Sequence, residues 1–328
     1  MTPLNTPGGI LVTMRTIIIG GVAAGMSAAT RLRRLDEDRE IVVFERGHHV
    51  SFANCGLPYY VGGVIEDRSS LLLQTPASLA SRFALQVHVR HEVVAIDTAA
   101  KTVKVRDLET GDERIEPFDD LVLGMGATTG DPIPGEGMPV ITLRSVEDVD
   151  AITAVLAEAA SPRAVVAGGG FIGIEAVENL VARGARVTLV QRGHQVLSPL
   201  DPEMVSPVHR ALSDAGVDLR TGVTVSGIGA GVATLSDGTE VPADLVVDAR
   251  GVRPDVHIAR AAGIALGPTG GIAVDDRHRT NVPDVWAVGD AVEKTDHLDG
   301  TATLVTMAGL ANRHGRAVAD DIAGAATV

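Results

Sequence analysis

Two stretches of the chain repeat one pattern of apolar and polar positions. Each has a short apolar run, a glycine-rich turn, a segment with helical spacing and a second apolar run. The elements predicted in this way are residues 16–20, a helix through about Leu35 and residues 41–45, then residues 164–168, a helix from about 172 to 183 and residues 187–191. Strands that alternate with helices at this spacing predict parallel sheets with helices on their faces.

The rest of the chain is predicted to form shorter strands and two crossings between domains. The elements expected are strands at 103–105, 121–123, 217–219, 233–235 and 245–247, crossings at 130–139 and 251–254, a strand within 272–290 and a helix at 311–322. We interpret the fold as α/β, with two Rossmann-like dinucleotide-binding domains, one inserted in the other. The outer domain is predicted to comprise residues 14–127 and 248–328, and the inserted one residues 128–247.

Composition narrows the range of partners. The chain has 328 residues, of which 45% are hydrophobic and 2% aromatic, so two domains must build their cores from Val, Ile, Leu and Ala. It carries 42 acidic and 28 basic residues, which gives a net charge of −14. This charge disfavours nucleic acid and anionic membranes, and an anionic ligand would need a local basic patch. No apolar run approaches the roughly 20 residues of a membrane span.

The N-terminal residues 1–13 are predicted to be a disordered extension. They are rich in Pro, Gly and Thr and lack the basic start and apolar core of a signal peptide. Either Met1 or Met14, directly before the first strand, is the start. The single cysteine excludes an internal disulfide and a four-cysteine metal site. No metal is predicted, and we expect a cytoplasmic protein.

The second glycine turn fits the dinucleotide-binding fingerprint GxGxxG fully. Gly168 allows the tight turn, Gly170 lets the backbone approach a pyrophosphate, and Gly173 permits close packing of the helix on the strand. Phe171 and Ile172 begin a helix whose N-terminus supplies free N–H groups for phosphate. These five residues are therefore candidate cofactor-binding residues.

The first glycine turn is a weaker match, because Val22 takes the position of the middle glycine. Glu45 supports the assignment, since a carboxylate at the end of the next strand can accept a hydrogen bond from a ribose hydroxyl. The candidate cofactor-binding residues of this stretch are Gly20, Val22, Ala23, Gly25, Glu45 and Arg46.

The position that corresponds to Glu45 in the second stretch is Gln191, which Arg192 follows. A carboxylate there would repel a 2′-phosphate, whereas glutamine and arginine can accommodate it. The inserted domain is therefore predicted to favour NADPH over NADH. The alternative is that Arg192 is simply a solvated loop charge.

Cys55 lies within residues 51–60, soon after the first repeated stretch, and Pro58 suits the first turn of a helix that starts near it. A thiol at a helix N-terminus ionises more readily than a free thiol, and the thiolate is the nucleophile. An isolated cysteine is usually a small buried hydrophobe. Its position between a nucleotide-binding fold and a helix start favours a reactive thiol instead.

The segment SFANCGLPYYVGG resembles the single-cysteine group of pyridine nucleotide–disulfide oxidoreductases, most closely the coenzyme A disulfide reductases. The resemblance extends from Thr16 to the end of the chain. It includes both glycine turns, the sequence GVRP at 251–254 and the motif that ends at Asp290. It implies that the outer domain binds FAD, with Asp290 at the ribityl–phosphate region, and that the inserted domain binds NADPH or NADH.

The resemblance also implies an activity. Hydride passes from the nicotinamide to the flavin, and reduced flavin cleaves a mixed disulfide formed on Cys55. The implied substrate is coenzyme A disulfide or a related persulfide or polysulfide. The residues that match coenzyme A contacts are Ser27, Arg31, Arg34, Ser51, Asn54 and Arg313. Arg31 and Arg34 share one helix face and can form the local basic patch; the alternative is a solvated charged helix.

Two departures from the family pattern leave alternatives open. Phe83 stands where some members carry a basic residue, and the chain stops at Val328, where the family continues into a dimerising C-terminal domain. The chain is either a fragment of a protein that would form a homodimer or a naturally short protein. The alternative functions are an NADH oxidase or peroxidase and a non-catalytic flavin-binding fragment or redox sensor.

Overall fold

The structure is a computed structural model in which residues 13–325 are described. The extension predicted to be disordered lies outside the described residues, except for residue 13. The chain divides into two compact units: unit 1 comprises the residues up to Ser51, 74–128 and those from Pro254, and unit 2 comprises 52–73 and 129–253. Segment 52–73, which the sequence analysis included in the outer domain, thus lies in unit 2. The domain boundaries at 127 and 247 stay predictions.

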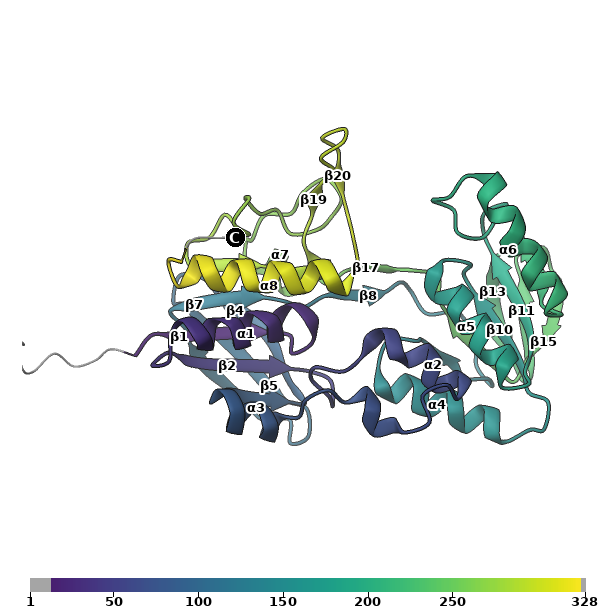
Figure 1. The fold of residues 1–328 in the computed structure, drawn as a ribbon, viewed down its shortest axis with the longest axis horizontal. Helices are drawn as coiled ribbons and strands as arrows, with labels where there is room; N and C mark the ends of the chain where they lie inside the picture. The colour runs from purple at the N-terminus through teal and green to yellow at the C-terminus, as the bar shows by residue number, and fades with distance from the viewer. Residues whose placement is uncertain (1–12, 326–328) are drawn as a thin grey trace, which may run out of the picture. The chain divides into compact units, whose positions relative to one another are not determined.

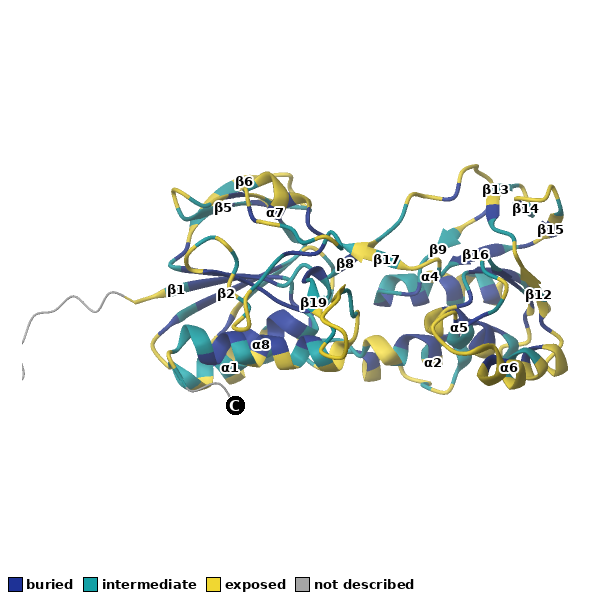
Figure 2. Cartoon of the chain, turned by 90° about the horizontal axis from the view of Figure 1, so that it is seen from above, coloured by how far each residue is buried: buried dark blue, intermediate teal, exposed yellow. Residues whose placement is uncertain are grey.

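Unit 1 is built around a five-stranded parallel sheet with the strand order β18-β7-β1-β2-β3. As predicted, a helix connects its first two strands, and their Ile, Val and Phe side chains are buried, as the dark blue of Figure 2 shows. The bounds are β1 (Arg15–Ile19), α1 (Ala23–Leu35), β2 (Glu40–Glu45), β3 (Gln86–Val89), β7 (Asp120–Leu123) and β18 (Val285–Ala287).

Helix α1 packs along α8 (Ala308–Ile322), the yellow helix of Figure 1. Gly315 permits a close approach of the two helices, since a Cβ at this position would overlap the carbonyl oxygen of Ala24. The remaining elements of unit 1 are α3 (Pro76–Phe83), an antiparallel sheet of β4 (His91–Asp97), β5 (Thr102–Asp107) and β6 (Glu113–Pro117), α7 (His257–Ala261), and the hairpin of β19 (Lys294–Thr295) and β20 (Ala302–Thr303).

Unit 2 repeats this architecture with a parallel sheet in the order β12-β11-β10-β16-β9. The predicted α/β class with two Rossmann-like domains is confirmed. The bounds are β9 (Val140–Ile141), α4 (Val146–Ala157), β10 (Arg163–Ala167), α5 (Phe171–Ala182), β11 (Arg186–Gln191), α6 (Pro202–Asp214), β12 (Asp218–Thr221), β13 (Val225–Gly229), β14 (Val232–Leu235), β15 (Glu240–Pro242) and β16 (Leu245–Asp248). β8 (Ala127–Thr129) and β17 (Val252–Pro254) lie where the chain passes between the units.

The segment that contains the cysteine packs on the helices of unit 2. It forms a 3-10 turn (Asn54–Gly56), helix α2 (Leu57–Gly62) and a second 3-10 turn (Arg68–Leu71), and α2 contacts α4 and α5. A Cβ at Gly62 would overlap Oδ1 of Asn179, so glycine is needed for the approach to α5. A salt bridge of 2.7 Å between Nη2 of Arg68 and a carboxylate oxygen of Asp150 fixes the far end of the segment to α4.

Candidate dinucleotide and thiol sites

The glycine turn after β1 is shaped by contacts within the protein. Gly20 has a φ of +99°, and a Cβ at this position would overlap the carbonyl oxygen of Gly124. A Cβ at Gly25 would overlap the carbonyl oxygen of Gly20. Both positions therefore need glycine, as the fingerprint predicts. Val22 is the N-cap of α1 and no side chain caps this helix, so its first N–H groups can donate to a phosphate.

The carboxylate of Glu45 is held at the end of β2 by two backbone N–H groups. Its Oε2 accepts from Gly21 and its Oε1 accepts from Gly47, both at 2.7 Å. A carboxylate offers about four acceptor sites, so this fixed group can also accept hydrogen bonds from ribose hydroxyls. The position predicted from the sequence thus carries a side chain that is already oriented.

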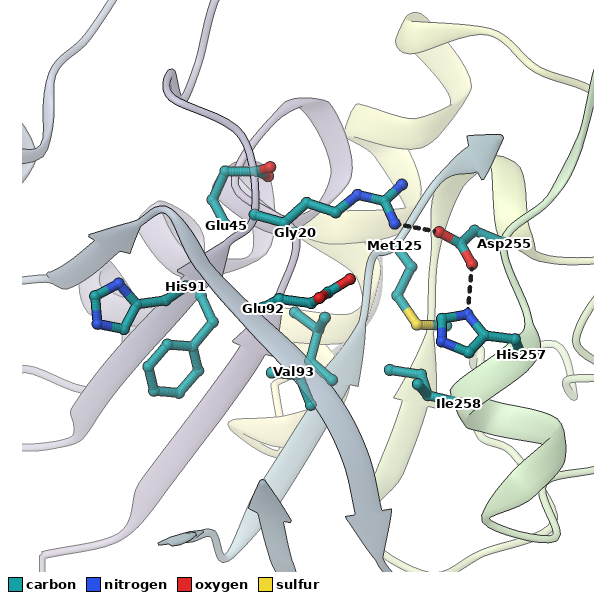
Figure 3. A pocket seen from close by; sticks show the side chains of 12 residues that line it. Gly20, Glu45, His91, Glu92, Val93, Met125, Asp255, His257 and Ile258 are labelled. Atoms are coloured by element: carbon teal, nitrogen blue, oxygen red, sulfur yellow. Dashed lines mark hydrogen bonds and ion pairs between the residues drawn. The ribbon is translucent and has the colours of Figure 1, made fainter. Parts of the chain in front are cut away.

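A pocket open to solvent lies beside this carboxylate, and Figure 3 shows the side chains around it. The lining comes from β1, β2, β4, the chain after β7 and the start of α7. It includes Glu45, Arg46, Glu92, Val93, Met125 and Asp255. The mixture of apolar walls and a few polar groups suits an adenosine. The sequence analysis missed the last four residues, because no local pattern separates them from ordinary strand and loop positions.

Asp290 lies in a 3-10 turn directly after β18. The turn packs on the start of α1, where a Cβ on Gly289 would lie 3.1 Å from that of Ala24. Lys294, which the sequence analysis also missed, donates from Nζ to the carbonyl of Gly289 at 2.9 Å. Burial lowers the pKa of Lys294, and the nearby carboxylate of Asp290 opposes that shift. The predicted flavin-binding positions of unit 1 therefore gather around the start of α1.

The glycine turn after β10 repeats the geometry of the first. Gly168 has a φ of +111°, and a Cβ at Gly168 or Gly173 would overlap a backbone carbonyl oxygen. Gly170 is different, because a Cβ there would meet no protein atom within 4 Å. Packing within the protein does not require glycine at this position. Its absent side chain instead leaves room for a group from outside, such as a pyrophosphate.

Side chains around this turn are arranged for a ligand as well. Phe171 and Ile172 begin α5 with exposed fractions of 65% and 44%, so both side chains are accessible to a ligand at this turn. Gln191 accepts a hydrogen bond at Oε1 from the N–H of Gly169 at 3.0 Å. This contact corresponds to that of Glu45 in unit 1, so the same place at the strand end carries a neutral side chain in unit 2.

The loops that follow the two strands are copies of one structure. Residues 45–51 read ERGHHVS and residues 191–197 read QRGHQVL. Ser51 and Leu197 both have a φ of +47°. Their backbone N–H groups donate to the carbonyl of the second glycine of their own turn, at 3.0 and 2.7 Å. The loops beside the two glycine turns are therefore equivalent in the two units.

The arginines of the two loops differ in their partners. Arg46 forms an ion pair of 2.8 Å with Asp255, a carboxylate that is 8% exposed. Arg192 is exposed, and no ion pair or side-chain hydrogen bond is found for it among residues 13–325. Unit 2 thus presents a cation without an ion-pair partner among the described residues beside Gln191, an arrangement that can accommodate a 2′-phosphate.

Cys55 is exposed and lies in the 3-10 turn that precedes α2. The helix starts at Leu57, two residues later than the cysteine, and Pro58 lies in its first turn as the sequence predicts. The alternative of a small buried hydrophobe is therefore wrong, because solvent reaches the residue. A disulfide of low molecular weight can approach an exposed thiol.

The six residues that match coenzyme A contacts divide between the units, with Asn54 in unit 2 and the other five in unit 1. Within unit 1, Ser27 donates from Oγ to Asn312 at 2.9 Å, and Arg31 forms an ion pair of 2.8 Å with Asp320. Both contacts join α1 to α8. The exposed members of the set are Asn54, Arg34 and Arg313.

The basic patch predicted from Arg31 and Arg34 is therefore organised differently. The charge of Arg31 is already neutralised within the protein. Arg34 lies 5.6 Å from the ring centre of Phe83, and Arg82 lies 5.5 Å from the same ring. The position where some family members carry a basic residue thus has an aromatic ring flanked by two guanidinium groups.

Neither a membrane span nor a metal centre is found in residues 13–325. No helix in this part of the chain is long and apolar enough to span a bilayer. No group of three or more His, Cys, Asp or Glu side chains in it is arranged to hold a metal ion.

Comparison with known proteins gives concordant matches. A family model for pyridine nucleotide-disulphide oxidoreductases matches residues 14–311. A curated relative, the coenzyme A disulfide reductase of Staphylococcus aureus (strain JH9), is 33% identical over 315 residues, which cover 96% of this chain and 72% of the relative.

Two solved structures are similar over most of this chain. Reduced Bacillus anthracis CoADR-RHD has a TM-score of 0.92 and 42% identity, covering 95% of this chain and 57% of that one. An NAD-dependent persulfide reductase from A. fulgidus has a TM-score of 0.92 and 35% identity, covering 96% and 60%. The chain therefore spans less than two thirds of the length of these two proteins.

Proposed function

Because the chain belongs to the pyridine nucleotide-disulphide oxidoreductase family, we propose that it reduces a small-molecule disulfide or persulfide of the coenzyme A type through Cys55. Its cofactors are FAD and a nicotinamide dinucleotide. The observation that carries the proposal is that the only cysteine of the chain is exposed, in the 3-10 turn that precedes α2. Relatives named for coenzyme A disulfide and for persulfide support the class of substrate.

The residues of unit 1 fit FAD. The first N–H groups of α1 would bind its pyrophosphate, Glu45 would accept from a ribose hydroxyl, and the adjoining pocket would hold the adenine. Asp290, in the 3-10 turn that packs on the start of α1, would bind the ribityl–phosphate region. When bound, FAD supplies two-electron transfer between a nicotinamide and sulfur.

The residues of unit 2 fit the nicotinamide dinucleotide. Gly170 leaves space for the pyrophosphate beside the start of α5. Gln191 and Arg192 would accommodate a 2′-phosphate, to which the guanidinium can donate hydrogen bonds. NADPH is therefore the proposed reductant.

The thiol chemistry belongs to the chain itself. The Cys55 thiolate attacks one sulfur of the substrate disulfide, so that the substrate S–S bond breaks, a mixed disulfide forms and one thiolate leaves. Two electrons then break the mixed disulfide, which releases the second thiolate and restores Cys55. One cysteine is sufficient for this cycle, because no internal disulfide takes part.

Replacement of the cysteine tests the proposal. Cys55→Ser should retain FAD and its reduction by NADPH but lose NADPH consumption with coenzyme A disulfide, because a hydroxyl cannot form the mixed disulfide. Flavin absorbance under anaerobic conditions measures the reduction of FAD by NADPH. Steady-state NADPH oxidation measures turnover with coenzyme A disulfide. Val64→Ser is the matched control, since this side chain lies in the same segment and is 72% exposed; its turnover should be unchanged.

The same assays separate the alternatives. Full disulfide reduction by Cys55→Ser would overturn the role of the thiol. Consumption of NADPH by the unmutated protein with oxygen or peroxide but not with a disulfide would instead identify an oxidase or peroxidase. Flavin reduction without turnover on any of these acceptors would favour a non-catalytic flavin-binding fragment or redox sensor.

A further inference from the structure

We propose that Asp255 is a positioning residue of the FAD site, which acts by holding the guanidinium of Arg46 at the adenosine pocket of unit 1. The inference rests on the proposed binding of FAD and extends it to a residue that no sequence motif marks. Asp255 follows β17 and precedes α7, whereas Arg46 follows β2, so the pair joins two distant segments of unit 1.

Each oxygen of the Asp255 carboxylate has a side-chain partner, and its backbone is held as well. The backbone N–H of Asp255 donates to the carbonyl of Gly126 at 3.0 Å. One carboxylate oxygen contacts Nη1 of Arg46 at 2.8 Å, and the other contacts Nδ1 of His257 at 3.1 Å. Figure 3 marks both side-chain contacts as dashed lines at the pocket. A carboxylate that is 8% exposed and held in this way is a rigid partner for an arginine side chain that is 47% exposed.

The second copy of the loop shows that this ion pair is not needed to build the loop. The loop at 191–197 has the same turn contact and the same φ of +47° at its last residue. Its arginine, Arg192, has no carboxylate partner among the described residues. The pairing with Asp255 therefore acts on the side chain of Arg46 and not on the backbone that carries it.

A fixed guanidinium is useful at this position for two reasons. Its plane can stack on an adenine ring, which binds arginine better than a compact ammonium. Its rotamer entropy is lost before the ligand arrives, so that FAD binding does not have to supply that cost. The carboxylate of Asp255 also offsets the positive charge of Arg46. Arg192 in unit 2 has no such partner among the described residues, so its charge stays available for a phosphate.

The dissociation constant of FAD tests the inference on the full chain after removal of bound flavin. Asp255→Asn should raise this constant about three- to tenfold, the effect expected when one side chain must be ordered on binding. Arg46→Met should raise it at least as much, because this change also removes the group that stacks on the adenine, and the double variant should be no weaker than Arg46→Met, because Asp255 acts only through Arg46. Quenching of flavin fluorescence on binding measures all four proteins.

Asp131→Asn is the matched control, since this carboxylate pairs with Arg253 in unit 2 and is 96% exposed; its FAD affinity should be unchanged. Thermal unfolding of the apo-proteins checks the fold, and Arg46→Met, at a half-exposed position, carries the test if Asp255→Asn does not fold. Additive losses in the double variant, or normal affinity in Asp255→Asn, would overturn the inference while FAD binding stands. A wild-type protein that binds no FAD would overturn the proposed function itself.

Discussion

One residue at the end of each second strand sets the charge of the two dinucleotide sites. Glu45 and Gln191 both accept a hydrogen bond from the second glycine of their turn, so they occupy equivalent places with different charges. A carboxylate at position 191 would face the 2′-phosphate of NADPH. We therefore expect the charge of this side chain to influence the preference between NADPH and NADH.

Gln191→Glu should shift the ratio of kcat/KM values from NADPH towards NADH by about 1–2 kcal/mol, the repulsion expected between two charges near a protein surface. Steady-state kinetics with both dinucleotides measure the shift. Flavin content should not change, because position 191 lies in unit 2. A clear preference of the unmutated protein for NADH would contradict the assignment.

Residue-level predictions from the sequence held where the signal is local. Gly20 and Gly168 were found because a positive φ and a close approach leave only glycine at those positions. The pairing of Arg31 with Asp320 could not be found, since 289 residues separate the partners and no motif marks the acid. Asp255 was missed for the same reason. One usable signal was overlooked, namely the similarity of ERGHHVS and QRGHQVL.

At the level of elements, helix α8 is held by more than its contact with α1. The ring of His314 in α8 lies against that of His278, which precedes β18, with 4.1 Å between the ring centres and an angle of 38° between the planes. Nδ1 of each ring is buried without a hydrogen-bond partner in the described part of the chain. Burial, then His278, Lys294 and Arg313, lowers the pKa of His314 to about 3. Burial and Lys294 also lower the pKa of His278.

This pair should make the fold sensitive to acid. An unfolded histidine binds a proton below pH 6.5, whereas the folded pair does not until a lower pH. The stability that comes from keeping this pair neutral is therefore fully present above pH 6.5. It is lost as the pH falls towards 3, because the unfolded chain then binds more protons than the folded one. The urea midpoint of the wild type should fall more between pH 7.5 and 5.0 than that of His314→Gln. An equal fall in both proteins would show that the pair is protonated without cost.

The start of α8 shows why element boundaries are harder to predict than elements. The sequence predicted a helix from 311, whereas it begins at Ala308. Its N-cap, Met307, makes no side-chain capping bond, so the sequence carries none of the Ser, Thr, Asp or Asn signals that mark a helix start. The glycine-bounded helices α1 and α5 were located more closely.

At the scale of the whole molecule, the chain carries two nucleotide-binding units of one design. The family membership confirms the resemblance inferred from the cysteine segment. The repeated strand–turn–helix pattern predicted both parallel sheets, because buried runs and glycine turns are visible within about 30 residues. The placement of segment 52–73 in unit 2 depends on contacts such as Gly62 with Asn179, which the sequence pattern does not reveal.

Equivalent substitutions in the two units provide a test of this design, because each serves as the control for the other. A Cβ at Gly25 would overlap the carbonyl oxygen of Gly20, and a Cβ at Gly173 would overlap that of Gly168. The steric change is the same in both turns, so the loss of stability should also be similar, about 1–3 kcal/mol. The ligand that is lost should differ between the two variants. Gly25→Ala should purify with little FAD and still bind NADPH, whereas Gly173→Ala should keep its FAD and lose NADPH binding.

Flavin absorbance and calorimetric titration with NADPH measure the two sites separately. If either substitution removed both ligands while the protein stayed folded, the two sites could not be independent copies, and the assignment of one dinucleotide to each unit would fail.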